Sequence, residues 1–377
     1  MELEHYVYSG TKKLRCGYTT GTCAALAAAG AARLLLTGKA PETVSLVTPK
    51  GWRVEVPVDR VEVFCGAARC AVRKDAGDDV DVTDGLLIYA TVCRTEAEGI
   101  SVDGGEGIGR VTKKGLDQPV GAAAINRVPR QMIRDQVRTV CREIGYTGGL
   151  SVIISAPGGL DIAEKTFNPQ LGIEGGISIL GTSGIVEPMS VQALIDTILL
   201  SEHQAAAAGS KRLILTPGNY GADFLRDQNL TGRDIPIVKC SNFIGEALDG
   251  AAVEGFESVL LVGHIGKLVK LAGGIMNTHS RWADCRTELF CAHAAIQGAD
   301  TEICRALMEA ATTDACIQIL EQSGLKESVM KSITRAVEVH LIRRAAGQYR
   351  IGAVLFSNVC GILGQTEEAL AMMEEWN

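Results

Sequence analysis

The densest group of residues able to do chemistry lies at 263–280, in the sequence GHIGKLVKLAGGIMNTHS. Two histidines and two lysines stand among four glycines, directly after SVLLV, an apolar run typical of a buried strand. Loops at the carboxyl ends of strands are where open α/β sheets bind ligands. Lys267 and Lys270 would share one face if the segment is helical. The spacing of His264 and His279 matches no metal motif, and it leaves open whether they act as ligands, bases or hydrogen-bond donors.

A second group is a run of cations that begins in the glycine-rich stretch GGEGIGRVTKKG, which lacks the G-x-G-x-x-G dinucleotide fingerprint. Six cations fall within 25 residues: Arg110, Lys113, Lys114, Arg127, Arg130 and Arg134. The chain as a whole has a net charge of −7, so an anion would need such a local cluster. The run therefore indicates a clamp for carboxylate or phosphate groups. A surface helix with scattered charges is the alternative, and for Arg134 we favour it.

A third stretch, GYTTGTCAALAAAGAA (17–32), is a hydroxyl-rich loop that leads into an alanine-rich helix. Free backbone N–H groups at such a helix start can hold a carboxylate or a phosphate. The alternative is that Thr20 or Thr22 caps the helix, and this stretch alone slightly favours it.

Five aspartates stand in the stretch KDAGDDVDVTDG, which does not follow the EF-hand pattern of calcium sites. We expect a strand, on which Asp79, Asp81 and Thr83 share one face while the two valines between them face the core. A solvated strand face fits this spacing, and so does a cluster that holds a cation or a ribose or acts as a base.

The segment SILGTSGIVEPMS (178–190) reads as a strand that runs into a loop. Its Thr182 and Ser183 are placed to line a cleft between two domains. The pattern is not the G-x-S-x-G nucleophile elbow, so we reject a serine hydrolase.

Length and composition bound the class of protein. A chain of 377 residues is long enough for two domains. The negative net charge argues against nonspecific binding to nucleic acid or to a membrane surface. No signal peptide is seen at the N-terminus, and the longest apolar run, CAALAAAGAARLLL, is too short to span a bilayer. We therefore expect a cytoplasmic protein whose twelve cysteines, without a C-x-x-C pair, are mostly small core residues.

Hydrophobic periodicity predicts the elements that position the candidate groups in the first half of the chain. A hairpin is expected at 43–58, and a strand pair or a bulged strand at 79–93. Helices are expected at 22–37, 129–144 and 190–208. These elements predict an α+β domain with glycine-rich loops over residues 1–190.

After Gly209 the pattern changes to apolar strands that are each followed by a polar or glycine-rich loop, with helical patterns between them. This is the βαβ signature of a parallel sheet. Residues 282–347 are predicted to be largely helical, and 351–357 to form a further strand. We predict a Rossmann-like α/β domain over residues 191–377, and hence a chain of α+β and α/β domains.

Six blocks of the sequence together resemble, in this order, the CbiD family: LRCGYTTGTCAALAA, KDAGDDVDVTDG, GGEGIGRVTKKGL, AINRVPRQMI, KTFNPQLGIEGGISILGTSGIVEPMS and VGHIGKLVKLAGGIMNTHSRWAD. They run from about Leu14 to Asp284. This is the family of cobalt-precorrin-5B C(1)-methyltransferases of anaerobic cobalamin (vitamin B12) biosynthesis. The resemblance implies a CbiD-like fold and an enzyme that moves a methyl group from S-adenosylmethionine to C-1 of cobalt-precorrin-5B, giving cobalt-precorrin-6A.

The resemblance also gives the candidate residues roles. The corrinoid substrate is a polyanion, and we expect it to bind Arg110, Lys113, Lys114, Arg127, Arg130, Thr182, Ser183, Lys267, Lys270 and Asn277. For the methyl donor, Asp75, Asp78 and Asp79 are candidates for the ribose and sulfonium, and Thr19, Thr20, Gly21 and Thr22 for its carboxylate. Methyl transfer needs in-line positioning more than acid–base work, but His264 or His279 could remove a proton. Cobalt arrives within the substrate, so no protein metal ligands are expected.

Two rival interpretations stay open at this point. A tetrapyrrole carrier without chemistry of its own would use the same basic clamp, and it would bind the corrinoid without consuming the methyl donor. A nucleotide-dependent phosphotransferase would suit the glycine loops with lysines, but no P-loop is present. The sequence leaves open whether the chain forms a homo-oligomer and whether it meets other enzymes of the cobalamin pathway.

Overall fold

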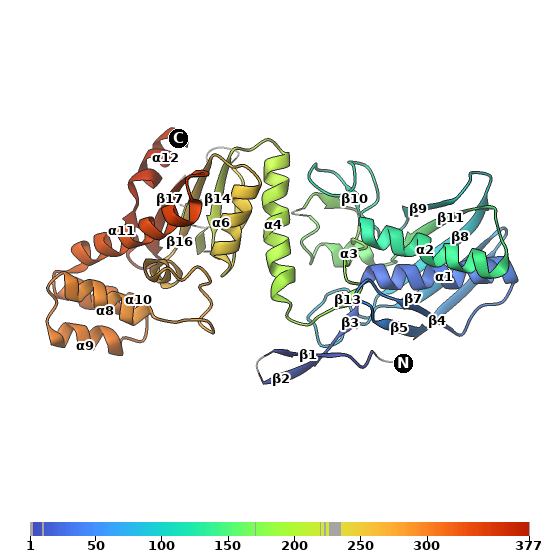
Figure 1. Cartoon of the computed structure of the whole chain (residues 1–377), viewed down its shortest axis with the longest axis horizontal. Coiled ribbons are helices and arrows are strands. Elements are labelled where there is room, and N and C mark those ends of the chain that lie inside the picture. Colours follow the sequence, from blue (N-terminus) through green and yellow to red (C-terminus); the bar gives the residue numbers. More distant parts are fainter. Residues whose placement is uncertain are drawn as a thin grey trace. The chain divides into compact units, whose positions relative to one another are not determined.

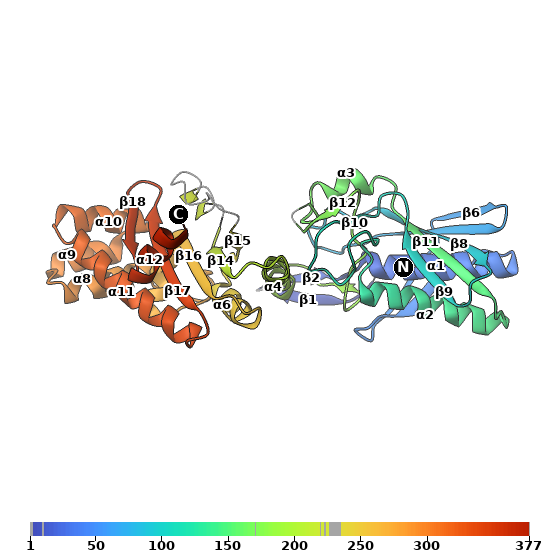
Figure 2. The same ribbon diagram turned by 90° about the horizontal axis from the view of Figure 1, so that it is seen from above.

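The structure, a computed structural model, describes residues 3–9, 11–169, 171–218, 220–221, 224–225 and 235–376. The chain forms two compact units, residues 1–191 and 192–377. Each unit has a sheet, helices and a hydrophobic core of its own (Figures 1 and 2). The chain is therefore a mixed α/β protein, as the sequence predicts.

The first unit is built on a five-stranded sheet in the order β6-β7-β8-β11-β9. Its strands are β6 (Arg60–Phe64), β7 (Ala67–Arg73), β8 (Leu87–Thr95), β9 (Ile100–Gly104) and β11 (Gly149–Ser155). Neighbours are antiparallel except β9 and β11, which are parallel. Two helices, α1 (Thr20–Thr37) and α2 (Arg127–Ile144), lie side by side against this sheet (Figures 1 and 2).

Shorter elements complete the first unit. They are β1 (Tyr6–Ser9), β2 (Lys12–Arg15), β3 (Gly17–Tyr18), β4 (Thr43–Val47), β5 (Arg53–Pro57), β10 (Arg110–Val111), β12 (Ile173–Glu174), β13 (Ile185–Val186) and α3 (Gly159–Ala163). The antiparallel pair β4–β5 is the hairpin predicted at 43–58. Its inward valines and leucine pack against α1, because period-two alternation places them on one face.

The second unit contains a five-stranded sheet in the order β15-β14-β16-β17-β18. Its strands are β14 (Arg212–Thr216), β15 (Ile237–Lys239), β16 (Ser258–His264), β17 (Arg350–Ser357) and β18 (Gly361–Gln365). The first four in spatial order are parallel, and β18 runs antiparallel at the edge. This agrees with the parallel sheet predicted after Gly209 and with the predicted strand at 351–357.

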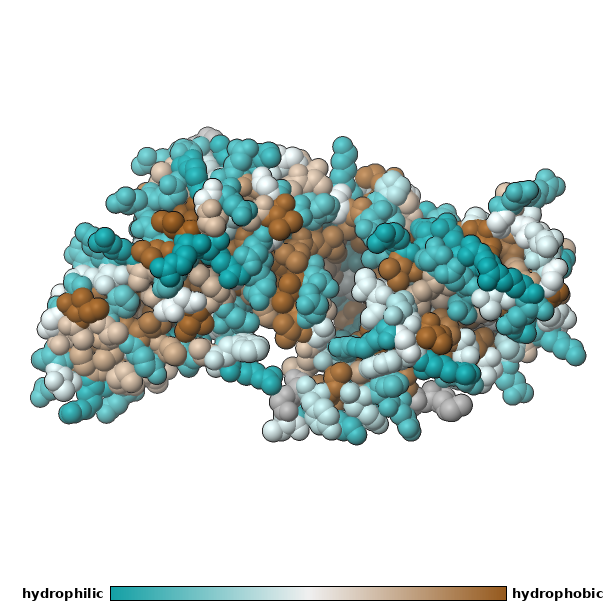
Figure 3. All heavy atoms as spheres, viewed as in Figure 1, coloured by the Kyte–Doolittle hydropathy of each residue, from teal (hydrophilic) through white to brown (hydrophobic). Residues whose placement is uncertain are grey.

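The helical elements described in the second unit are α4 (Val191–Ala207), α6 (Ile244–Val253), α7 (Ile265–Leu268), the 3-10 helix η1 (Val269–Gly273), α8 (Arg286–Ile296), α9 (Thr301–Glu309), α10 (Thr313–Gln322), α11 (Lys326–Ala345) and α12 (Glu367–Trp376). Helices α8 to α11 confirm the helical prediction over 282–347. One side of the sheet packs mainly on α6 and α11, and the other packs on α12. On the face seen in Figure 3, hydrophobic side chains follow α4, where Val191 and Leu194 are about half exposed.

The predicted strand over 79–93 is wrong in its first half, because β8 begins only at Leu87. Residues before it form turns, and the side chain of Val80 is 98% exposed instead of buried. The Asp81 carboxylate accepts hydrogen bonds from the backbone N–H and the hydroxyl of Thr83, at 2.8 and 2.7 Å. Aspartates that bind the nearby backbone compete with strand pairing. The strand face expected from the alternating aspartates therefore does not form.

Helix α1 is the only helix among the described residues that is long and apolar enough to cross a membrane by length and composition. Of its 18 residues, Thr20–Thr37, 78% are buried inside the protein. Its small alanine side chains let it pack closely against β7, β8 and α2. This burial is what a core helix shows.

Candidate functional site

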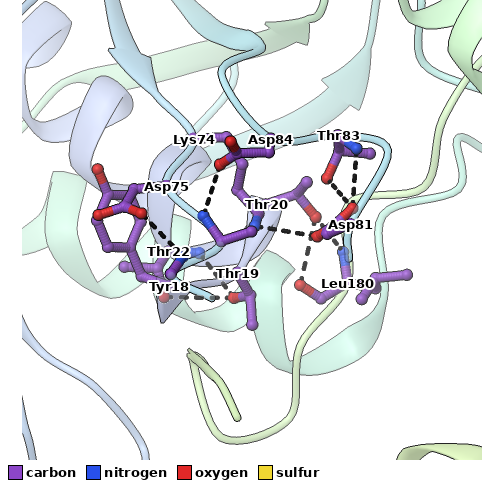
Figure 4. Close-up of polar contacts among 12 residues, drawn as sticks. Tyr18, Thr19, Thr20, Thr22, Lys74, Asp75, Asp81, Thr83, Asp84 and Leu180 are labelled. Atoms are coloured by element: carbon purple, nitrogen blue, oxygen red, sulfur yellow. Dashed lines mark hydrogen bonds and ion pairs between the residues drawn. The ribbon is translucent and has the colours of Figure 1, made fainter. Parts of the chain in front are cut away.

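Three segments that are distant in the sequence meet at the start of α1 and form a threonine–aspartate cluster: residues 18–22, 74–85 and 178–184 (Figure 4). The Thr19 hydroxyl caps α1 by accepting from the N–H of Thr22 at 3.2 Å. This corrects the prediction that Thr20 or Thr22 is the cap.

The other hydroxyls and N–H groups at this helix start also have partners within the chain. The Thr20 hydroxyl accepts from the N–H of Leu180 at 3.0 Å, and the Thr22 hydroxyl donates to the carbonyl of Gly184 at 2.7 Å. The N–H of Gly21 donates to the carbonyl of Leu180 at 3.1 Å. The predicted donor-carboxylate site at Thr19, Thr20, Gly21 and Thr22 is therefore occupied by the protein's own loop.

The three aspartates predicted for the methyl donor hold the main chain instead. Asp75 forms a two-bond ion pair with Arg15, at 2.7 and 2.8 Å. Burial opposes ionisation of Asp75, but the bonds from Arg15 prevail and lower its pKa. Asp78 accepts from the backbone N–H of Arg15 at 2.6 Å, and Asp79 accepts from that of Met189 at 3.0 Å. These carboxylates tie together loops of the first unit.

Lys74 is a residue of this cluster that the sequence analysis missed. Its side chain is almost fully buried, and its ammonium pairs with Asp81 at 3.1 Å. Burial opposes ionisation of Asp81, while the charge of Lys74 lowers the pKa of that carboxyl. A buried ammonium needs such a partner, because desolvation is costly. The available signal was a lysine directly after the buried run of β7 and just before the aspartates.

Two cations of the predicted clamp have partners in the first unit. Arg110 forms a forked pair with the carboxylate of Asp103, at 2.9 and 3.2 Å, and also donates to the carbonyl of Gly104 at 2.7 Å. The half-buried Arg130 donates to backbone carbonyls of Val102 and Ala123. Burial lowers the pKa of the Arg130 guanidinium. Both arginines hold β9 and its neighbours together.

Three other predicted clamp residues, Lys113, Lys114 and Arg127, are exposed. Within the described residues these three have no ion pair. Arg134 donates to the carbonyl of Ile100 at 3.3 Å. This fits the interpretation favoured above, in which Arg134 is a surface charge of the helix and not part of the clamp. Of the cations predicted in this unit, the three exposed ones are available to a ligand.

A groove of about 510 Å³ lies between the β4–β5 hairpin and α2. Its walls are Leu46, Val47, Thr48 and Pro49 on one side and Arg127, Val128, Gln131, Met132, Asp135 and Gln136 on the other. The loop at 180–184 contacts the turn of the hairpin, because the N–H of Lys50 donates to the carbonyl of Ser183 at 3.0 Å. The Ser183 hydroxyl is bonded to the backbone of Ile185, whereas Thr182 is exposed.

In the second unit, the predicted segment 263–280 does lie at the carboxyl end of β16. His264 is the last residue of that strand and caps α7, because its Nδ1 accepts from the N–H of Gly266 at 3.1 Å. The ring of Phe356 meets it edge-on, with centroids 5.8 Å apart. Burial lowers the pKa of His264, against the opposing pull of Asp314.

The tautomer of His264 follows from its cap bond. A backbone N–H can only donate, so Nδ1 is the acceptor and the neutral ring carries its proton on Nε2. The ring is then a hydrogen-bond donor toward any ligand. His279, which is exposed, shows the same pattern, since its Nδ1 accepts from the N–H of Arg281 at 3.1 Å. The geometry therefore favours a donor role for both over the predicted role of base.

The two lysines of the segment bind backbone carbonyls. Lys267 donates to the carbonyls of Pro217 and Ser241 and so joins the loops after β14 and β15. Lys270 is 2% exposed, and its ammonium donates to the backbone carbonyls of Thr278 and Ala283. This burial contradicts the prediction that Lys270 binds substrate.

Asn277 also supports the loop. Its side-chain oxygen accepts from the N–H of His279 at 3.1 Å, and its backbone bridges to Phe243. Among the residues that the structure describes, no group of three or more His, Cys, Asp or Glu side chains is placed to hold a metal ion.

Comparison with known proteins places these features in a family. The model of the family CbiD matches residues 7–188, and that of its C-terminal domain, CbiD_C, matches residues 277–367. A protein of Ruminiclostridium cellulolyticum named cobalt-precorrin-5B C(1)-methyltransferase is 49% identical over 95% of this chain and 92% of its own length. A protein of the same name from Alkaliphilus metalliredigens is 42% identical over 99% and 97%.

A solved structure is also similar. It is the cobalamin biosynthesis protein (cbiD) from Archaeoglobus fulgidus, with 32% sequence identity over 74% of this chain and 87% of that chain. The TM-score is 0.40.

Proposed function

This chain belongs to the CbiD family, and we propose on that ground that it methylates C-1 of cobalt-precorrin-5B in cobalamin biosynthesis. The observation that carries this function is the similarity to methyltransferases of that name over nearly the whole chain, 49% identical over 95% of it in one case. The chain is thus an enzyme that acts on a cobalt-precorrin. A carrier without chemistry is not favoured, because these relatives are named for the transfer.

The methyl donor that we propose is S-adenosylmethionine, with cobalt-precorrin-6A as the product. The nucleophilic carbon attacks the methyl group, the C–S bond breaks, and its electron pair stays on sulfur in S-adenosylhomocysteine. Such a displacement is governed by alignment of the two reactants. This requirement suits His264 and His279. In each ring Nδ1 accepts a backbone N–H, so the Nε2–H group can position a ligand by donating a hydrogen bond to it.

Substrate recognition follows from charge. A precorrin carries several carboxylates, and the exposed cations Lys113 and Lys114 are free of ion pairs within the described residues of the first unit. We propose that these lysines bind peripheral carboxylates, with the exposed hydroxyl of Thr182 on a separate loop of the same unit. The tied cations Arg110 and Arg130 shape the loops from which the lysines extend.

The second unit is, in our interpretation, a Rossmann-like α/β domain. Four parallel strands in the order β15-β14-β16-β17, with helices on both faces, support this. In such sheets ligands bind at the carboxyl ends of the strands. His264 and Lys267 stand at that edge, at the end of β16 and in α7. Cytoplasmic location and the absence of nucleic-acid or membrane partners stay predictions.

The test is an oxygen-free incubation of the purified chain with S-adenosylmethionine and cobalt-precorrin-5B, followed by mass spectrometry. We expect the tetrapyrrole to gain one methyl group and an equal amount of S-adenosylhomocysteine to form. Tight binding of the tetrapyrrole without any mass gain or donor consumption would refute the proposal and would favour the carrier.

A further inference from the structure

The groove between the β4–β5 hairpin and α2 has the size and polarity of a small-molecule site. Its volume of about 510 Å³ lies within the range of roughly 300–1,000 Å³ that such sites occupy. Leu46, Val128 and Met132 supply apolar walls, and Met132 and Leu46 are at most 9% exposed. A planar heterocycle would find a dry surface there.

One end of the groove is positive. Arg127 is the first residue of α2, and Asn126, which precedes the helix, makes no side-chain cap bond to it. The N-terminal end of the helix dipole and the exposed guanidinium therefore present positive charge at the same place. A guanidinium is suited to a two-bond contact with a carboxylate.

The other end is polar and carries a carboxylate that is paired with Arg138. Asp135 lies eight residues further along α2, which is about 12 Å at the helical rise. One of its oxygens, Oδ1, accepts from Gln131 at 2.8 Å and from Arg138 at 2.7 Å. The two donors keep the carboxylate fixed, and its second oxygen can accept from a ligand.

We propose that this groove binds the methyl donor, S-adenosylmethionine, with the donor carboxylate at Arg127 and the ribose hydroxyls at Asp135. The inference rests on the proposed function. S-adenosylmethionine carries its carboxylate at one end and its ribose and adenine toward the other, so the ribose can reach Asp135 while the adenine contacts the apolar wall. A tetrapyrrole polyanion fits less well, because it is larger than the groove.

The position of the groove suits the reaction. The loop at 180–184 packs against the hairpin turn, since a side chain at Gly184 would lie 2.9 Å from Thr48 and 3.1 Å from Pro49. The loop that carries the exposed Thr182 therefore adjoins two wall residues of the groove, Thr48 and Pro49. The site differs from the threonine–aspartate cluster, whose groups are bonded to one another.

The experiment is equilibrium titration of the full chain with S-adenosylhomocysteine, an unreactive product, and with S-adenosylmethionine. Arg127→Gln and Asp135→Asn each remove one contact, and Val47→Trp fills the groove without changing its charge. We expect each to weaken binding by on the order of tenfold or more. Arg142→Gln, an exposed arginine in the last turn of the same helix, is the matched control and should bind as the wild type does.

Turnover separates this inference from the proposed function. With the tetrapyrrole present, we expect a higher KM for the donor and an unchanged kcat at saturating donor in Arg127→Gln. Donor affinity equal to wild type in all three variants would overturn the site while leaving the methyltransferase function intact. Weakened tetrapyrrole binding with unchanged donor binding would overturn it too, because the groove would then hold a substrate carboxylate. A wild-type protein that binds S-adenosylhomocysteine but transfers no methyl group would instead refute the proposed function.

Discussion

Glu202 should make the stability of the second unit depend strongly on pH. This glutamate on α4 is fully buried, and among the residues that the structure describes neither of its carboxyl oxygens has a hydrogen-bond partner. Helix α6 approaches it closely at Gly250, where a Cβ atom would lie 2.1 Å from Oε2. Burial, with a smaller contribution from the negative Glu254, raises the pKa of Glu202 to about 9. The folded protein therefore keeps this carboxyl protonated at neutral pH.

The sign and size of this pH dependence follow from the linkage between proton binding and folding. Below about pH 4.5 both the folded and the unfolded chain hold the proton, so the group contributes no pH dependence there. Between that pH and the folded pKa of about 9 only the unfolded state ionises, and the free energy of unfolding falls by about 1.4 kcal/mol per pH unit. At pH 7 the loss amounts to about 3 kcal/mol relative to pH 4.5. Stability is lost as the pH rises.

The variant Glu202→Gln keeps the shape of the side chain but cannot ionise, so it should remove this slope. Urea unfolding would be measured from pH 5.5 to 8.5. In a Trp52→Phe background the fluorescence change would report the second unit through Trp376, which is 6% exposed. Asp196→Asn, an exposed acid on the same helix, is the matched control and should retain the wild-type slope.

The outcome is decided by the difference between two curves. The gap in the free energy of unfolding between Glu202→Gln and wild type should widen by about 4 kcal/mol from pH 5.5 to 8.5. Parallel curves would show that the carboxyl is not held neutral and that the burial argument is wrong. Comparison of slopes avoids the unknown cost of burying the Gln amide, because that cost does not change with pH.

Three further predictions concern the charged and polar groups of the two units. Lys74→Met should lower the free energy of unfolding by about 2 kcal/mol in urea titrations, because it leaves the partly exposed Asp81 without its partner. His264→Ala should cost about 1 kcal/mol through loss of the α7 cap, and His264→Asn should restore most of it; equal stability of the two would contradict the cap. Charge reversal of Lys113 and Lys114 to Glu should raise the KM for the tetrapyrrole, more at low salt, and leave the KM for the methyl donor unchanged.

Elements with a clean periodicity were predictable from the sequence. Helices α1, α2 and α4 begin and end within two residues of the predicted bounds, and the β4–β5 hairpin forms where alternation indicates it. The aspartate-rich turn before β8 was not predictable by the same argument. There the side chains bind the backbone locally, and that competes with the strand that the alternation favours.

The roles of the cations could not be predicted, because a charge in the sequence does not reveal its partner. Lys270 and Arg110 are as basic in the sequence as Lys113, yet the fold gives Lys270 loop carbonyls and gives Arg110 the carboxylate of Asp103. These partners lie 7, 8 and 13 residues away in the sequence, and no local pattern marks the loops that bring them together. The groove shows the same limitation, since its walls come from the 46–49 turn and from α2, which no local pattern relates.

The blocks that identify the family encode a structural junction of the first unit. The chain at 15–17 crosses the chain at 75–77, with a bridge between Cys16 and Gly77. A Cβ atom at Gly17 would lie 2.3 Å from the backbone of Ala76, and one at Gly77 would lie 2.2 Å from the Arg15 carbonyl. Neither position can accept a side chain without moving the main chain. Gly17 of CGYTTGT and Gly77 of KDAGDD are therefore required by one and the same crossing.

This crossing explains why the threonines and aspartates of the first two family blocks have partners within the chain. The threonine and aspartate side chains around it satisfy backbone groups that the close crossing would otherwise leave buried and unpaired. The hydroxyls of Thr20 and Thr22, for example, hold the start of α1 against the loop at 180–184 through hydrogen bonds. In the proposals above, a ligand is bound by side chains that the junction leaves exposed, among them those of Lys113, Lys114 and Arg127. The family blocks thus carry both kinds of residue: those that hold the junction together and those, such as Lys113, Lys114 and Arg127, that stay exposed.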